Sequence, residues 1–119
     1  MPLGPSCPQW VALDECLAKL VRRCRARFAA VIDAGKCVWC SSPDLDIHLQ
    51  FAAADRFYKV EIKPREGSLR RGAHVVLENL DGPDFYVGES FAAIYFLVIW
   101  FARPRSLDSV REHLRAALP

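Results

Sequence analysis

The sequence predicts an α+β fold in which a five-stranded antiparallel sheet carries helices on both faces, with the elements in the order α-β-β-α-β-β-β-α. Helix-spaced apolar stripes occur near both ends of the chain, and short apolar runs separated by turn residues lie between them. Residues 94–101 are apolar at every position, which is typical of a strand buried on both faces. Together these observations indicate one sheet between two helical layers.

The first element is expected to be an amphipathic helix that starts near Pro8. Ser6 and Gln9 have the spacing of a capping box, and proline is favoured in a first helical turn. Apolar residues then recur along one side: Trp10, Leu13, Leu17, Leu20, Val21 and Cys24. Four arginines follow at its end, at positions 22, 23, 25 and 27, and spread around a helix axis, so we interpret them as a solvated helix end.

A hairpin and a second helix are expected next. Residues 28–33 and 36–41 have the composition of strands around a tight turn at 34–35. After a break at 42–44, an apolar stripe predicts the second helix: Leu45, Leu49, Ala52, Ala53 and Phe57. Because Pro64 and Gly67 interrupt helical structure, residues 59–71 are expected to form an irregular, charged connection.

Three strands and a closing helix complete the prediction. The strands are expected over residues 73–79, 84–90 and 94–101, with a turn at 81–83. In the last strand, both sets of alternating residues are apolar, which places it in the middle of the sheet. The final helix follows Pro104 and Ser106, and its stripe consists of Leu107, Val110, Leu114 and Leu118.

Composition limits the class of protein. The 119 residues suit a single domain, 1–119, with residues 1–8 as a flexible lead-in. The net charge of +2, from 16 basic and 14 acidic residues, argues against nucleic-acid binding, which needs a clustered basic face. The N-terminus lacks a secretory signal, and the apolar run 91–102 is shorter than the roughly 20 residues of a membrane-spanning helix. We therefore expect a cytoplasmic protein with no membrane insertion.

Cys37 and Cys40 have the spacing of a redox motif or of half a zinc site. On a regular strand, residues three apart face opposite sides, whereas a disulfide or a shared zinc needs both sulfurs together. No second cysteine pair follows, and the three histidines lie on separate predicted elements: His48, His74 and His113. We therefore expect structural thiols, no metal and no cofactor, and a small thiol-redox protein that uses Cys37 and Cys40 is an alternative function.

No nucleophile elbow, phosphate loop or paired-acid motif occurs, so no catalytic residue and no enzyme activity are expected. A small-ligand sensor is a further alternative, but it needs a cavity between sheet and helix, where Trp39, Phe96 and Trp100 are bulky. Phe51, Phe57 and Tyr58 on the second helix are interpreted as a partner-binding patch, since aromatic residues often anchor interfaces. For Phe57, a position in the core is equally compatible with the pattern.

The C-terminal third resembles a known family. The segment Phe85-Tyr-Val-Gly-Glu-Ser precedes the apolar run 94–101, and Arg103-Pro-Arg-Ser-Leu opens a last helix that contains Arg111. With the element order, this pattern is similar to the Roadblock (dynein light chain-related) family, in particular its bacterial MglB/MglC-type regulators of cell polarity and gliding motility. The resemblance implies a Roadblock/longin-like fold and a non-catalytic module that regulates or scaffolds a Ras-like small GTPase pathway. Its implied partners are a Ras-like small GTPase or a paralogous Roadblock regulator.

The resemblance also implies a homodimer in which the third strand pairs with its copy, and the residues support this independently. If residues 73–79 lie at the sheet edge, their backbone groups are open, and no proline or lysine in the strand blocks pairing. Pairing across a two-fold axis would satisfy those groups. The expected dimer-interface residues are His74, Val75, Val76, Leu77 and Glu78.

Overall fold

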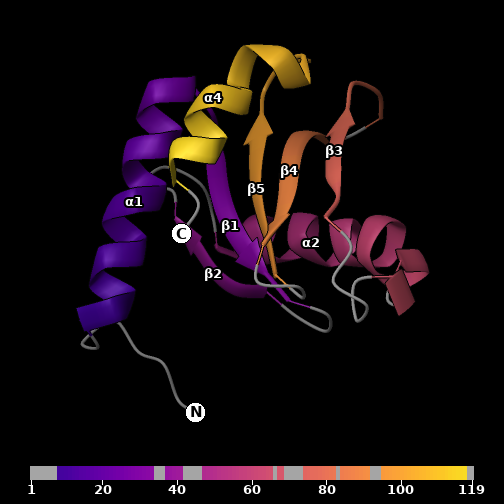
Figure 1. Ribbon diagram of the computed structural model, residues 1–119, viewed down its shortest axis with the longest axis horizontal. Coiled ribbons are helices and arrows are strands. Elements are labelled where there is room, and N and C mark those ends of the chain that lie inside the picture. The colour runs from indigo at the N-terminus through magenta and orange to yellow at the C-terminus, as the bar shows by residue number, and fades with distance from the viewer. Residues whose placement is uncertain are drawn as a thin grey trace.

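The computed structural model describes residues 8–33, 37–41, 47–65, 67–68, 74–82, 84–91 and 95–117. The predicted α+β class is confirmed, because helices cover an antiparallel sheet (Figure 1). The helices are α1 (Pro8–Cys24), α2 (Ile47–Phe57) and α4 (Leu107–Ala117). The strands are β1 (Phe28–Ile32), β2 (Cys37–Ser41), β3 (Val76–Asn79), β4 (Phe85–Phe91) and β5 (Tyr95–Phe101). They form one antiparallel sheet in the order β2-β1-β5-β4-β3.

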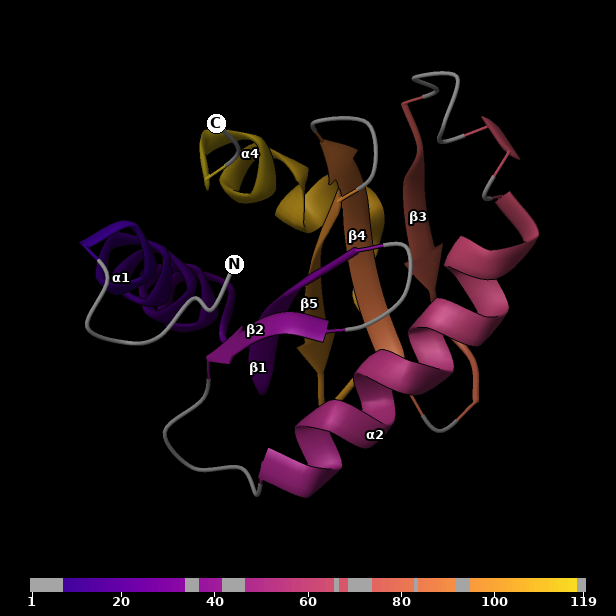
Figure 2. The same cartoon turned by 90° about the horizontal axis from the view of Figure 1, so that it is seen from below.

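β5 lies in the middle of the sheet, between β1 and β4, as its two apolar faces predict. One set of its side chains is buried under α1 and α4: Leu97, Ile99 and Phe101. The other set is buried under α2: Phe96, Val98 and Trp100. Figure 2 shows these two helical layers on opposite faces of the sheet. The strand therefore takes part in both hydrophobic cores, which explains why it has no polar face.

The stripes of the first and last helices are where the sequence predicts them. Leu17, Leu20, Val21 and Cys24 of α1 are buried, and so are Val110 and Leu114 of α4. Burial raises the pKa of the Cys24 thiol, and the nearby Arg105 guanidinium partly offsets this. The side chains of Trp10, Leu13 and Leu118, and residue Ser6, lie outside the described residues.

The end of α1 differs from the expected continuous helix. The helix stops at Cys24, and Arg25 takes the left-handed conformation, with φ of 54°. The Ala26 N–H donates to Val21 O at 2.9 Å, so the chain closes as a helix C-terminal turn in which glycine is the usual residue. An arginine in this conformation costs about 1 kcal/mol relative to glycine. The four arginines therefore lie on the last helical turn and on the turn that follows it.

The phase of α2 was predicted only in part. Ala53 and Phe57 of the expected stripe are buried, whereas Leu49 and Ala52 are exposed, and Leu45 lies outside the described residues. The rest of the buried side consists of Gln50 and Ala54, so that Phe57 is its one large apolar residue among those described. Such small and polar residues give a weak apolar periodicity, so a rotation of the helix by about one residue was not visible in the sequence.

Helical structure also continues further than predicted. A π-helix covers Tyr58–Ile62 and a 3-10 turn covers Lys63–Arg65, so the first part of the expected irregular connection over 59–71 is a helix extension. Ile62 is fully buried in the core under α2, which fixes this extension to the sheet. Pro64 is tolerated because it lies at the start of a new turn, where a missing N–H removes few hydrogen bonds.

Candidate protein-binding surface

β3 is the outermost strand of the sheet beyond β4. It pairs with β4 on one side, and no other strand of the described residues lies along its opposite side. In Figure 2 the strand stands at the margin of the sheet, next to the far end of the α2 helix. An edge strand of this kind presents unpaired backbone groups that a second chain is able to complete.

The ladder between β3 and β4 shows which backbone groups are open. The Ser90 N–H donates to Val75 O at 2.8 Å, and the Val75 N–H donates to Ser90 Oγ at 2.7 Å, so the backbone of Val75 faces β4. In an antiparallel pair, successive residues alternate between facing the partner strand and facing away from it. With Val75 directed to β4, Leu77 faces β4 as well, and the amide and carbonyl groups of Val76 and Glu78 point outward.

Polar side chains of this segment are engaged within the chain. Glu78 Oε2 accepts a hydrogen bond from the Leu107 N–H at the start of α4. His74 Nε2 lies 3.0 Å from Glu89 Oε1, and Asn79 Nδ2 donates to the carbonyl of Asp84. Of the five residues expected at a dimer interface, two therefore use their side chains inside the subunit. Among the described residues, no strand pairs with the outer backbone edge of β3.

Glu89 is a buried carboxylate that the sequence reasoning did not single out. It is 1% exposed, and Arg115 Nε of α4 lies 3.8 Å from its Oε1. Its second oxygen, Oε2, has no hydrogen-bond partner among the described residues. A charged residue within an otherwise uncharged strand was the signal that would have identified it. The pair with His74 ties the segment before β3 to β4 on the α4 side of the sheet.

A groove of about 300 Å³ lies beside this edge, between the end of α2 and the β3–β4 turn. Its lining consists of Arg56, Phe57, Lys59, Val60, Asn79, Asp84 and Tyr86. Leu49 and Val60 are 56% and 62% exposed, which is unusual for large apolar side chains. Neither residue was predicted to bind a partner. The predicted stripe of α2 placed Leu49 in the core, and Val60 was expected in an irregular connection.

An ion pair and a hydrogen bond form the rim of this groove. Arg56 makes a bidentate pair with Asp84, with donor–acceptor distances of 2.7 and 2.9 Å, and this bond raises the pKa of Arg56. The Tyr86 hydroxyl donates to Glu61 Oε2 at 2.9 Å. Burial, and then this hydrogen bond, raise the pKa of Tyr86 above its ordinary value. These bonds hold α2 and the following π-helix against β4.

The expected aromatic patch on the second helix is corrected in one of its members. Phe57 is 1% exposed, and its ring contacts those of Tyr86, Phe96 and Trp100, at centroid distances of 5.0, 5.5 and 5.9 Å. A side chain enclosed in this way stabilises the helix but offers no surface to a partner.

The other two aromatic residues are accessible. Phe51 is 45% exposed, and Tyr58 is partly buried against the core under α2. They are seven residues apart, or about two helical turns, and so lie on one flank of the helix. Leu49 and Val60 lie on the other flank.

The argument against a redox pair needs correction. The register of β1 and β2 shifts between Val31 and Ile32, so Cys37 pairs with Ile32 and Cys40 pairs with Ala30. Those two partners are two residues apart on β1, and regular alternation no longer separates the cysteines. Their side chains lie outside the described residues. Among the described residues, no group of three or more His, Cys, Asp or Glu is placed to hold a metal ion.

Aromatic side chains fill the space between the sheet and α2. Phe28 stacks on Trp100 at a centroid distance of 4.5 Å, and Tyr86 lies 6.2 Å from the same ring. The bulk that Phe96 and Trp100 were expected to contribute is thus present in the core. These rings occupy the space between the sheet and α2 that an internal ligand cavity would need.

The sheet with α1 and α4 on one face and α2 on the other, ending in the open strand β3, is a Roadblock fold of the MglB type. The solved structure of Myxococcus xanthus MglB is similar, with a TM-score of 0.63 and 17% sequence identity, over 92% of this chain and 90% of that chain. No family model matches the sequence, and no curated protein matches it. Within the described residues, no helix is long and apolar enough to cross a membrane.

Proposed function

We propose that this protein is a non-catalytic, cytoplasmic binding module that regulates or scaffolds a Ras-like small GTPase pathway of the polarity or motility type. It acts as a homodimer built on paired β3 strands. Its partners are a Ras-like small GTPase, a paralogous Roadblock regulator or both. The open outer edge of β3 carries the proposal, and the MglB-like fold supports it.

Pairing of β3 with its copy would create a binding platform. In a continuous antiparallel sheet, the two-fold axis between identical strands is perpendicular to the sheet, so equivalent helices stay on the same face. The two α2 helices would therefore lie on one side of the joined sheet. Their exposed apolar residues, among them Leu49 and Val60, would face the same partner.

Nucleotide chemistry belongs to the partner in this proposal. The exposed apolar side chains of the α2 helices would contact a protein surface, and they carry no charge that could stabilise a phosphate group. If the dimer stimulates GTP hydrolysis, it does so by stabilising one arrangement of the mobile switch segments of the GTPase. The same platform would also serve to hold a second Roadblock dimer.

Replacement of Val76 by proline tests the proposal. The Val76 N–H points away from β4, so proline removes a donor from the open edge without removing a bond of the β3–β4 ladder. We expect light scattering to give the 13.4 kDa mass of one chain for Val76→Pro and twice that mass for the wild type. Binding to a Ras-like GTPase loaded with a non-hydrolysable GTP analogue should fall in parallel.

Val76→Thr is the matched control, because it keeps the N–H and a β-branched side chain. It should remain a dimer and bind the GTPase like the wild type. Circular dichroism must show that Val76→Pro is folded. A folded Val76→Pro protein that still has the dimer mass would contradict the β3 interface.

A further inference from the structure

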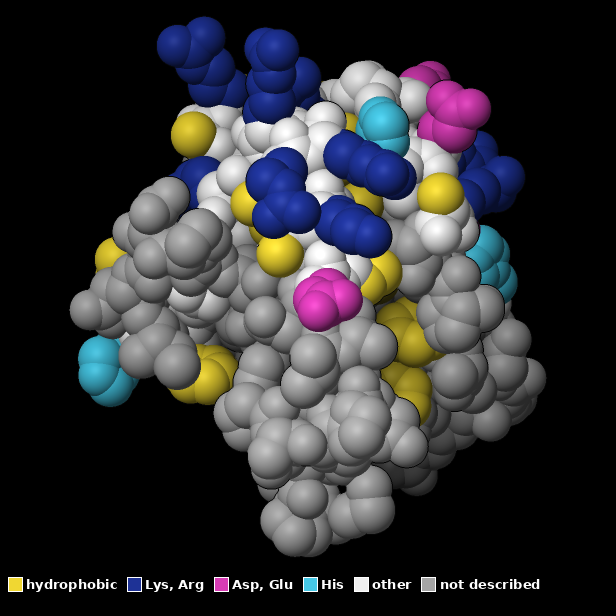
Figure 3. Space-filling view, turned by 90° about the vertical axis from the view of Figure 1, so that its left-hand side faces the viewer, with side chains coloured by type: hydrophobic (Ala, Val, Ile, Leu, Met, Phe, Trp, Pro, Cys, Tyr) yellow, Lys and Arg dark blue, Asp and Glu magenta, His cyan; other side chains and the backbone are white. Residues whose placement is uncertain are grey.

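The two faces of the molecule differ in how far their positive charges are paired with carboxylates. On the α2 side, carboxylates neutralise three cations: Arg56 with Asp84, Lys59 with Asp55, and Arg65 with Glu61. On α1 and its terminal turn, four exposed cations have no ion pair within the described residues: Lys19, Arg22, Arg23 and Arg25. Figure 3 shows the Lys and Arg side chains gathered on this side of the molecule.

Arg25 indicates that this charge is retained against the preference of the backbone. It is the one non-glycine residue with positive φ among those described. Glycine would occupy the same turn with less strain, and would stabilise the end of α1. Strained positions of this kind often carry function, because the side chain supplies something that the fold itself does not need.

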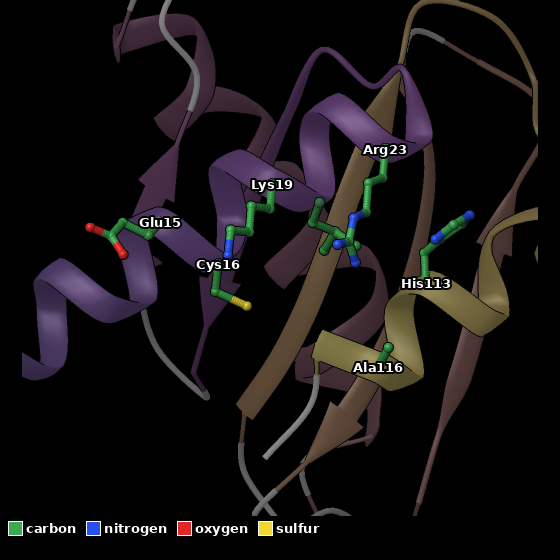
Figure 4. Close-up of a pocket in the computed structure, with 7 residues that line it drawn as sticks. Glu15, Cys16, Lys19, Arg23, His113 and Ala116 are labelled. Atoms are coloured by element: carbon green, nitrogen blue, oxygen red, sulfur yellow. The ribbon is translucent and has the colours of Figure 1, made fainter.

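A groove accompanies the unpaired cations. It has a volume of about 270 Å³ and lies between α1 and α4. Lys19 and Arg23 line it from α1 and His113 from α4, and Leu20 and Ala116 add apolar surface (Figure 4). Lys19 and Arg23 are four residues apart and so project from the same side of the helix. The groove therefore combines two cations, one carboxylate (Glu15) and an apolar wall.

We propose that this groove and the adjoining end of α1 bind an acidic segment of a partner protein, whose carboxylates meet Lys19, Arg23 and Arg25. Charge complementarity favours such a segment, and the apolar wall suits the methylene groups of glutamate side chains. The site lies on the face of the sheet opposite α2. It is therefore independent of the proposed GTPase platform, and both surfaces are free to be occupied together.

Two other anionic partners fit this surface less well. Membrane-surface binding usually adds exposed apolar anchors, and the large exposed apolar side chains among those described are Leu49, Phe51, Val60 and Leu80, none of them in residues 15–24 of α1 or 107–116 of α4. A nucleic acid needs a continuous basic stripe. Here the exposed cations form a short cluster at one end of α1, at positions 19, 22, 23 and 25, and not a stripe across the molecule.

Binding of a short fluorescein-labelled poly-glutamate peptide, followed by fluorescence anisotropy, tests this proposal. Wild-type protein should bind the peptide at low ionic strength and more weakly at physiological salt, because salt screens exposed charges. Arg23→Glu should weaken binding at least tenfold. Arg25→Gly should weaken binding several-fold and at the same time raise the melting temperature, since glycine relieves the strained turn.

The matched control is Lys63→Ala, which removes an exposed cation far along the chain from this groove and should leave peptide binding within twofold of wild type. An unchanged affinity in Arg23→Glu, or no binding by the wild type, would show that the proposal is wrong. Phosphatidylserine vesicles and single-stranded DNA are measured in the same assay. Tighter binding of either than of the peptide would also overturn the assignment to an acidic protein segment.

Discussion

Tyr86 lies where the aromatic core under α2 meets the polar rim of the α2 groove. Its ring contacts Phe57 and Trp100, while its hydroxyl donates to Glu61. Burial and this hydrogen bond favour the protonated phenol, so the folded chain holds the Tyr86 proton more tightly than the unfolded chain does. The contribution of this proton to the free energy of unfolding is fully present below the ordinary tyrosine pKa of about 10 and is lost as pH rises above that value.

Tyr86→Phe should therefore change the pH dependence of stability as well as its size. At pH 7 the variant loses one hydrogen bond, and its free energy of unfolding should fall by about 1 kcal/mol. Above about pH 10 the wild type loses the stability linked to the Tyr86 proton, whereas the variant has no such proton to lose. Urea denaturation at pH 7 and above about pH 10 should show that the difference in unfolding free energy between wild type and variant is smaller at the higher pH. A larger difference at the higher pH would contradict the assigned cause.

Residue-level interactions of this kind were largely beyond the reach of the sequence. The pair of His74 with Glu89 joins residues 15 positions apart, and it depends on the register of β3 against β4. A one-residue slip of a strand would turn each side chain to the other face. The pattern predicted that the two strands exist, but it held no information on which polar side chains would meet.

Among the elements, α4 depends on a strand that is distant in the sequence. Glu78 of β3 accepts the hydrogen bond of the first amide of the helix, at Leu107. Its negative charge also lies at the positive end of the helix dipole. The Glu78 carboxylate thus connects the edge strand β3 to α4, which lies over the core on that face of the sheet.

Glu78→Ala should lower the free energy of unfolding by about 1 kcal/mol, which is the usual effect of removing a helix N-cap. Glu78→Gln keeps an acceptor oxygen but loses the charge, so it should lie between the alanine variant and the wild type. Glu112→Ala removes an exposed carboxylate within the same helix and should change stability by less than about 0.5 kcal/mol. Urea denaturation measures all three, and equal effects for Glu78→Ala and Glu112→Ala would exclude the capping role.

The elements themselves could be predicted where apolar residues are large and regularly spaced. α1 and α4 have such stripes, and β5 is apolar on both faces, so their burial was foreseen. Apart from Phe57, the buried side of α2 consists of small or polar residues, and its phase was predicted only in part. The π-helix after Phe57 was also missed. Pro64 suggested that helical structure ends before it, whereas the chain continues there into a 3-10 turn.

At the scale of the whole molecule, the sheet separates two surfaces of different chemistry. One holds exposed apolar residues on α2 and its helical extension, and the other holds along α1 exposed cations that make no ion pair within the described residues. The sequence showed that residues 73–79 contain no proline or lysine to block pairing, but their place at the sheet edge was only a condition of that argument, and the strand order supplies it for β3. Neither the α2 flank nor the α1–α4 groove was predictable, since each is formed by elements whose relative placement depends on tertiary packing.

The proposed platform leads to a binding prediction for the α2 flank. The double variant Leu49→Glu/Val60→Glu places two charges on its exposed apolar surface, and should weaken binding to a Ras-like GTPase at least tenfold, or about 1.4 kcal/mol. The dimer mass should not change, because neither residue is on β3. Ser109→Glu adds a charge on α4, on the other face of the sheet, and should leave GTPase binding as in the wild type. Calorimetric titration makes the comparison, and wild-type affinity in the double variant would exclude this flank as the docking surface.

The central position of β5 also has a consequence for biosynthesis. β1 and β4 each pair with β5 and not with each other, so a nascent chain that has not yet exposed residues 95–101 holds only two separate hairpins. Both of these carry uncovered apolar surface until the fifth strand leaves the ribosome and joins them. The sheet is therefore completed only after residues 95–101 have left the ribosome, and through contacts between residues far apart in the chain, which slow folding.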